Sequence, residues 1–170
     1  MQLVRHDVSV RVLACTPSDI AADYLAGRLA AAGLDSDKLY RLTAPLLLED
    51  DVSENGSTSA QVPRREKLLS FRVVLSTCSS AGILQNDVPT GHFSHIIIDE
   101  AAQAEEPLVM IPILTFSDAY TNIILAGDSN QLGPIIKSPT AAMSGLGKTY
   151  FQRLMTMGEV YGFDAQAGKT

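Results

Sequence analysis

The sequence predicts an α/β domain built on a parallel sheet that carries helices on both faces. Short apolar runs typical of buried strands alternate along the chain with segments of helical character. The 170 residues, of which 46% are hydrophobic and 19% charged, are enough to bury a core of ordinary size. Hydroxyl and acidic residues follow several apolar runs where each run ends. In such sheets, functional residues belong at the carboxyl ends of the strands.

The first two elements form a strand, a short polar turn and a helix. Residues 8–15, "VSVRVLAC", alternate and then become apolar, which predicts a strand. Ser18 is a good N-cap for the helix that follows at residues 20–32, and Gly33 ends it. The apolar stripe predicted to face the sheet consists of Ile20, Tyr24, Leu25 and Leu29.

The rest of the chain continues the alternation. Further strands are predicted at residues 38–42, 71–78, 95–99 and 122–128. Residues 107–114 predict a short helix broken or kinked at Pro112, and residues 149–157 an amphipathic helix. The acidic, serine-rich stretch within residues 49–66 lacks periodicity and predicts a mobile surface loop. We expect one partial domain over residues 1–157, followed by a tail or the start of another segment at 158–170.

Composition excludes several classes of protein. No apolar run approaches the roughly 20 residues that span a bilayer, which predicts a soluble, cytoplasmic chain with no membrane partner. Cys15 and Cys78 end two apolar runs and are expected to be buried thiols. The net charge of −6 argues against nucleic-acid binding by bulk charge, so any such contact must be local.

The stretch "FSHIIIDEAAQAEEP" at residues 93–107 runs three isoleucines straight into Asp99 and Glu100. Burying a carboxylate is costly unless a cation or hydrogen bonds compensate it. In P-loop NTPases, such a strand end holds the magnesium of the bound nucleotide and places a base beside the attacking water. On this pattern Asp99 is the Mg²⁺ ligand and Glu100 the base. A solvated strand end that begins a helix is the alternative.

The segment "GDSNQLGP" at residues 127–134 follows the last predicted strand. Its Gln131 is suited to donate an amide hydrogen bond to a terminal phosphate. The alternative is a surface turn, because Gly, Asp, Asn and Pro are ordinary turn residues.

Four blocks in order resemble the motifs of superfamily 1 helicases of the Upf-like branch. They are "VLACTPSDIAAD" at 12–23 (motif Ia), "VVLSTCSSAG" at 73–82 (the next nucleic-acid-contact motif), "IIDEAAQ" at 97–103 (motif II) and "LAGDSNQLGP" at 125–134 (motif III). "GHFSH" at 91–95 and "GLGKTYFQRLM" at 145–155 are most similar to the Armitage-type RNA helicases of RNA silencing and decay. Asp19 departs from the family pattern, which usually has Asn there.

This resemblance implies a RecA-like fold and an ATP-dependent helicase that moves along single-stranded RNA. It implies that Asp99 binds Mg²⁺, that Glu100 activates water and that Gln131 senses the γ-phosphate. Asp128 and Gln103 are implied as further ATP-binding residues. The nucleic-acid backbone contacts that it implies are Thr16, Pro17, Ser18 and Thr77. Two alternatives stay open: a DNA helicase of the same branch, and a non-catalytic RecA-like interaction module.

The phosphate-binding loop itself is expected upstream of residue 1. Residues 147–149 and 168–170 both read Gly-Lys-Thr, but G-x-x-x-x-G-K-[ST] then requires glycine where the chain has Ala142 and Phe163. Both segments are expected at the surface. The strand before the P-loop is expected inside the sheet, between strands of this chain, and a second RecA-like domain is expected elsewhere in the protein. A basic cluster, Arg64, Arg65, Lys67 and Arg72, either borders an RNA path or is a solvated stretch.

Overall fold

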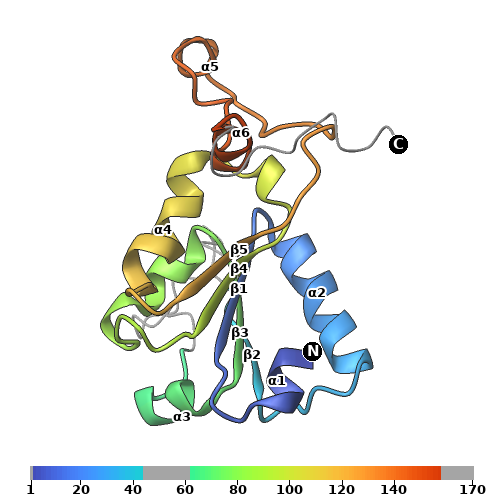
Figure 1. The fold of residues 1–170 in the computed structure, drawn as a ribbon, viewed down its shortest axis with the longest axis vertical. Coiled ribbons are helices and arrows are strands. Elements are labelled where there is room, and N and C mark those ends of the chain that lie inside the picture. The colour runs from blue at the N-terminus through green and yellow to red at the C-terminus, as the bar shows by residue number, and fades with distance from the viewer. Residues whose placement is uncertain (1, 44–61, 158–170) are drawn as a thin grey trace, which may run out of the picture.

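The computed structural model describes residues 2–43 and 62–157, which form a five-stranded parallel sheet between two layers of helices (Figure 1). The strand order is β2-β3-β1-β4-β5. The strands are β1 (Val12–Thr16), β2 (Leu39–Arg41), β3 (Val73–Thr77), β4 (His95–Ile98) and β5 (Asn122–Leu125). The α/β sheet predicted from the alternation of elements is therefore confirmed.

The described sheet is continuous from β2 to β5. β1 is buried at all five positions and pairs with β3 on one side and β4 on the other, while β4 pairs with β5. The expectation that an absent strand lies between strands of this chain is therefore wrong, because each described strand is hydrogen-bonded to its neighbour. β5 lies at the margin of the described sheet, and its Ile123 and Ile124 are 43% and 41% exposed.

Two strands begin or end at other residues than predicted. β1 begins at Val12 rather than at residue 8, and Val8 is exposed in the turn that follows the first helix. β5 ends at Leu125, so the predicted residues 126–128 lie beyond it in a loop. From Ala126 on, the backbone leaves the strand and contacts the acidic turn, which consists of residues 99–103 after β4.

Helices α1 (Gln2–His6) and α2 (Asp19–Ala31) cover one face of the sheet (Figure 1). Ser18 caps α2 as predicted, since its Oγ accepts a hydrogen bond from the Ala21 backbone N at 3.3 Å. The predicted apolar stripe is half wrong. Leu25 and Leu29 pack toward the sheet, whereas Ile20 and Tyr24 are 84% and 67% exposed. The small buried Ala22 lets the helix approach the sheet along a neighbouring stripe instead.

The opposite face carries the larger core. The 3₁₀-helix η1 (Ser80–Asn86) and helix α4 (Glu106–Phe116) pack there against alternate residues of the strands. The buried side chains of α4 are Val109, Pro112, Ile113 and Phe116. The predicted break at Pro112 does not occur, because its ring is buried and the helix continues through it to Phe116.

Four shorter elements complete the fold: α3 (Arg65–Ser70), η2 (Ala101–Gln103), α5 (Pro139–Met143) and α6 (Tyr150–Met155). α3 begins inside the predicted loop 49–66, so that loop was extended too far; residues 49–61 lie outside the described residues. α6 confirms the helix predicted near 149–157. Its N-cap Thr149 is fully buried rather than at the surface, because a reciprocal capping box with Gln152 holds it. Residues 158–170, including 168–170, are also outside the described residues.

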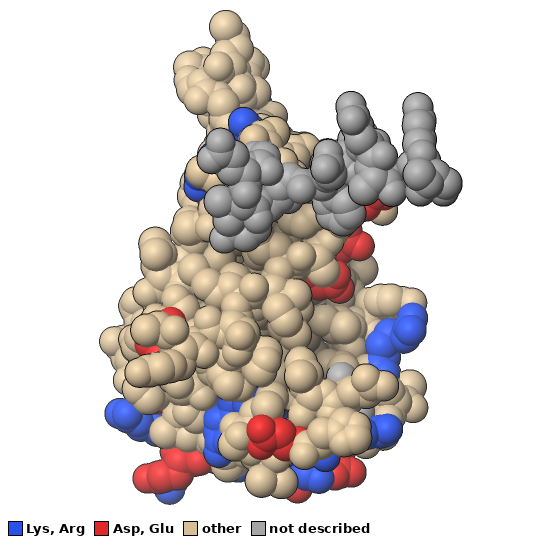
Figure 2. All heavy atoms as spheres, in the orientation of Figure 1, with Lys and Arg blue, Asp and Glu red and all other residues tan. Residues whose placement is uncertain are grey.

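Basic residues gather at the amino ends of the strands. Figure 2 shows most of the visible Lys and Arg atoms in the lower part of the molecule, where Figure 1 places α3. Arg72 supports the backbone there, donating to the carbonyl oxygens of Val10 at 2.8 Å and Val4 at 3.1 Å. The predicted basic cluster thus lies at the amino ends of the strands, opposite the edge that carries Asp99 and Glu100. In the part of the chain that is described, no helix is both long enough and apolar enough to cross a membrane.

Candidate functional site at the carboxyl edge of the sheet

The parallel sheet brings four of the sequence motifs to one edge. Thr16 at the end of β1 is in register with Thr77 at the end of β3. Asp99 follows β4, and its backbone N donates to the Cys15 carbonyl at 2.8 Å. Ile98 is in register with Leu125, so the 127–134 segment starts beside the acidic pair. Strand ends distant in sequence therefore form a single rim, as the polar pattern predicted.

The acidic turn has an unusual backbone. Glu100 has φ 55° and ψ 35°, and among the described non-glycine residues it alone has a positive φ. A left-handed residue of this kind costs about 1–2 kcal/mol and persists only where the surroundings impose it. Asp99 stabilises the turn, because its Oδ1 accepts a hydrogen bond from the Glu100 backbone N at 3.1 Å. Strained backbone of this sort is common at functional sites.

The Glu100 carboxylate is held by its neighbour in the turn. Gln103 Nε2 donates to Glu100 Oε2 at 2.9 Å, and the Gln103 backbone N donates to the Glu100 carbonyl at 2.9 Å. Both side chains of this pair come from one turn of η2, whose Ala101 and Ala102 are buried. Gln103, predicted to bind nucleotide, therefore also orients the predicted base.

The acidic turn rests directly on the segment after β5. The Ala101 backbone N donates to the Ala126 carbonyl at 2.8 Å. A Cβ placed on Gly127 would lie 2.9 Å from the Ala102 N and 3.2 Å from the Ala101 N. Real Cβ atoms essentially never come this close to backbone, so glycine at 127 is what permits the contact. The sequence showed both segments but not that one supports the other.

Asp128 and Gln131 form the second polar turn of the site. Asp128 Oδ1 accepts a hydrogen bond from the Asn130 backbone N at 2.9 Å, and Gln131 Nε2 lies 3.5 Å from Asp128 Oδ2. Both side chains are exposed. Gln131 and Gln103 line the same open hollow of about 500 Å³, together with Asn130 and Leu132. The structure thus brings the predicted phosphate sensor to the same hollow as Gln103, the residue that holds the Glu100 carboxylate.

A second hollow, of about 320 Å³, joins the acidic turn to the end of β1. Its walls are formed by Pro17, Ser18, Ala21, Glu100, Gln103 and residues 132–135. Pro17 is half-buried and Ser18 is exposed. Two of the predicted nucleic-acid contacts therefore share one cavity with the predicted base.

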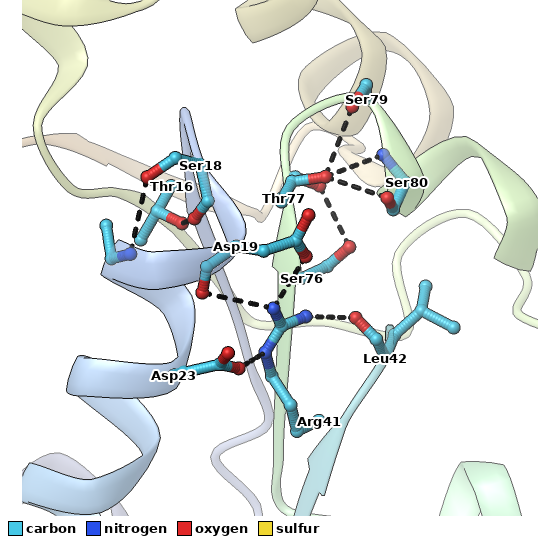
Figure 3. Close-up of polar contacts among 11 residues, drawn as sticks. Thr16, Ser18, Asp19, Asp23, Arg41, Leu42, Ser76, Thr77, Ser79 and Ser80 are labelled. Carbon is cyan, nitrogen blue, oxygen red and sulfur yellow. Dashed lines mark hydrogen bonds and ion pairs between the residues drawn. The ribbon is translucent and has the colours of Figure 1, made fainter. Parts of the chain in front are cut away.

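The other two predicted contacts, Thr16 and Thr77, are buried residues whose hydroxyl groups form hydrogen bonds within their own turns (Figure 3). Thr16 Oγ1 donates to the Ser18 carbonyl at 2.8 Å, which shapes the turn after β1. Thr77 Oγ1 lies 2.8 Å from Ser80 Oγ and accepts from the Ser80 backbone N at 3.1 Å. Their predicted contact with a nucleic-acid backbone stays a prediction, and Ser18 is the exposed hydroxyl of the set.

Arg41, which the sequence analysis did not single out, lies beside this turn. Its Nη2 is 2.7 Å from Asp19 Oδ1 and its Nε 2.8 Å from Asp23 Oδ1 (Figure 3). The signal in the sequence was weak: two aspartates four residues apart at a helix start, and an arginine near the end of a predicted strand.

Asp99 is the carboxylate of this edge that was predicted to bind a metal ion. No group of three or more His, Cys, Asp or Glu able to hold a metal occurs within residues 2–43 and 62–157. Mg²⁺ in nucleotide sites usually takes one or two carboxylates, with phosphate oxygens and waters as the remaining ligands. Half-buried Asp99 fits that role, and it closes one end of an apolar cavity of about 220 Å³ between the sheet and α2.

The two thiols near this edge are unreactive. Cys15 and Cys78 are free and buried, as predicted. Burial raises the pKa of Cys78 to about 12 and raises that of Cys15 well above its ordinary value, with the nearby Cys78 adding to the effect on Cys15. Neither thiol is suited to nucleophilic chemistry.

Comparison with known proteins places these features in a family. The family described as "AAA domain" matches residues 47–139. The chain is 37% identical over 179 residues to the zebrafish (Danio rerio) "Putative helicase mov-10-B.1", an alignment covering 96% of this chain and 18% of that protein. It is 30% identical over 181 residues to the Drosophila melanogaster "Probable RNA helicase armi", covering 91% of this chain and 15% of the relative.

A yeast relative also matches. The chain is 32% identical over 186 residues to the "ATP-dependent helicase NAM7" of Saccharomyces cerevisiae, covering 88% of this chain and 18% of that protein. The chain therefore spans less than a fifth of the length of these three relatives. The motif order, the parallel sheet and these similarities agree: the chain belongs to the superfamily 1 RNA helicases of the Upf-like branch, close to the Armitage-type members.

Proposed function

We propose that this chain is the part of a first RecA-like domain, residues 1–157, that carries the hydrolytic and RNA-contact edge of an ATP-dependent RNA helicase. The helicase couples ATP hydrolysis to movement on single-stranded RNA in silencing or decay, in the cytoplasm. The observation that carries this proposal is the meeting of the Glu100 turn with Gln131 and Ser18 at one hollowed rim. The P-loop segment and a second RecA-like domain come from the rest of the protein.

Each polar residue of the rim has a defined task in this proposal. The Asp99 carboxylate would hold the Mg²⁺ of bound ATP, and that ion would neutralise charge on the phosphates. Glu100, oriented by Gln103, accepts the proton of the attacking water. Gln131 donates its amide to the γ-phosphate, and Asp128 limits the rotation of that amide. The hydrogen bond from the Ala101 N to the Ala126 carbonyl couples the segment that carries Gln131 to the turn that carries Glu100.

RNA lies across the turns that follow β1 and β3. Ser18 and the adjoining backbone amides contact phosphate and sugar, while the buried Thr16 and Thr77 hydroxyls keep those turns in shape. Contacts of this kind carry no base information. Binding is therefore expected to tolerate any sequence and to weaken with salt.

The test uses the full-length protein with the substitution Glu100→Gln. ATP hydrolysis should fall by about 10² to 10⁴-fold with little change in ATP binding, because a general base acts only in the transition state. Asp99→Ala should instead weaken Mg²⁺-dependent nucleotide binding. Glu105→Gln is the matched control: it removes the same charge five residues further on, and hydrolysis should be unchanged. Equal hydrolysis by wild type and Glu100→Gln would refute the assignment.

The preference for RNA over DNA is tested in the same protein. Single-stranded RNA should stimulate hydrolysis more than single-stranded DNA of the same sequence. Stronger stimulation by DNA would favour a DNA helicase of the same branch. Absence of both ATP binding and hydrolysis in the full-length protein would favour a non-catalytic interaction module.

A further inference from the structure

The start of α2 carries two carboxylates beside the turn proposed to contact RNA. Asp19 directly follows Ser18, and Asp23 lies one helical turn further, on the same side of α2. Their side chains are 56% and 66% exposed. A carboxylate on the residue after Ser18 lies within about 10 Å of any phosphate that Ser18 binds, which is roughly one Debye length at 0.1 M salt. Left unpaired, these charges would oppose RNA at this edge.

Arg41 occupies the position that offsets them. It is the last residue of β2, so parallel pairing with β3 carries it to the same sheet edge as Thr77. Its guanidinium contacts Asp19 through Nη2 at 2.7 Å and Asp23 through Nε at 2.8 Å (Figure 3). Nη2 also lies 3.3 Å from the Asp19 carbonyl, and Nη1 donates to the Leu42 carbonyl.

The geometry indicates a fixed group rather than a mobile surface charge. The Arg41 side chain is only 14% exposed, and all three of its nitrogen atoms have partners. Arginine suits this task because its planar fork reaches two carboxylates and a carbonyl at once. A guanidinium so engaged has little capacity left for a phosphate, so its effect on RNA acts through Asp19 and the turn.

We propose that Arg41 is a positioning residue for RNA binding: it neutralises Asp19 and anchors the start of α2, so that the turn at residues 16–18 accepts a phosphate. This inference rests on the proposed RNA-binding function of that turn. It also gives the aspartate at position 19 a compensating partner within the chain. Arg41 therefore contributes to RNA affinity without touching RNA.

The test measures binding of a fluorescent single-stranded RNA to the full-length protein by anisotropy at low and high salt. Arg41→Ala should weaken binding by about three- to tenfold at low salt, and by less at high salt, because one screened charge is uncovered. Asp19→Asn in the Arg41→Ala background should restore affinity to within about twofold of wild type. The melting temperature of this double variant should stay as low as that of Arg41→Ala, since the ion pair is absent from both.

Lys38→Ala is the matched control. Lys38 precedes β2 at the opposite edge of the sheet and forms an ion pair with Asp35, with its own side chain 45% exposed. Its removal should leave RNA affinity unchanged.

Two results would overturn the inference. If the double variant binds RNA as weakly as Arg41→Ala, Arg41 contacts phosphate itself or supports only the fold. If Arg41→Ala binds as tightly as wild type, the charges at the start of α2 do not matter to RNA. Failure of wild type to bind RNA would instead refute the proposed function, so the two failures are distinguishable.

Discussion

The left-handed backbone at Glu100 predicts that glycine at this position will give a more stable chain than alanine, although both substitutions remove the carboxylate. Glu100→Gly and Glu100→Ala both remove the carboxylate and its hydrogen bond from Gln103. They differ only in how the backbone tolerates φ 55°. Comparing these two variants therefore isolates the backbone energy of the acidic turn.

The size of the effect follows from two opposing terms. Alanine at a left-handed position costs about 1–2 kcal/mol, a cost that glycine does not carry. Glycine loses about 0.4–1 kcal/mol through the greater freedom of its unfolded chain. With the midpoints of the two ranges, the balance favours Glu100→Gly over Glu100→Ala by about 0.8 kcal/mol, which corresponds to about 2–3 °C in Tm for a domain of this size.

Thermal unfolding of the 170-residue variants, followed by circular dichroism, measures this difference. Glu66 provides the control, since it lies in the first turn of α3 with ordinary helical geometry. There the order should reverse, with glycine less stable than alanine by up to about 1 kcal/mol. A Tm for Glu100→Gly at or below that of Glu100→Ala would refute the strained turn. In the full-length protein both Glu100 variants should lose ATP hydrolysis.

Three further predictions concern the supports of the site. Gly127→Ala should lower both kcat for ATP hydrolysis and Tm, because its Cβ would meet the Ala102 N at 2.9 Å; an unchanged kcat would mean that the acidic turn does not rest on this glycine. Hydrogen bonds from Arg153 hold the pKa of Glu106 below its ordinary value of about 4.3, so this pair stabilises fully above that pH and less as pH falls through the lower folded pKa. The Tm loss caused by Arg153→Gln should accordingly shrink between neutral pH and about pH 3; a loss independent of pH would contradict the linkage. Because burial raises the pKa of Cys78 to about 12, a thiol-reactive dye at about pH 8 should label it only after unfolding, and rapid native labelling would contradict its burial.

Sequence reasoning predicted the parts of the site better than their mutual support. Apolar runs and the rule for parallel sheets were enough to bring Asp99, Ser18 and Gln131 to one edge, because that outcome depends only on chain direction. The left-handed Glu100 could not be read from its neighbours, since a tertiary hydrogen bond from Ala101 to Ala126 fixes the turn.

Other features were missed because periodicity alone does not say which stripe of a helix faces the sheet. Ile20 is exposed because α2 packs through the stripe of Ala22, Leu25 and Leu29. The role of Arg41 depends on β2 pairing with β3, a neighbour more than thirty residues away in sequence. Long-range pairing of this kind has no local signature.

The exposed margin at β5 has a practical consequence for handling the protein. Strands β3, β1 and β4 each have a hydrogen-bonded strand on both sides, whereas β2 and β5 are the two margins of the described sheet. Within that sheet, the outer side of β5 carries unpaired backbone amide and carbonyl groups. Asn122–Leu125 contains no charge and no proline, the two devices by which natural sheets discourage foreign strands. At high concentration the outer edge of β5 is a template to which a strand of a second molecule adds. Solubility screens should therefore begin with a lysine at Ile123, placed where an incoming chain would have to bury it.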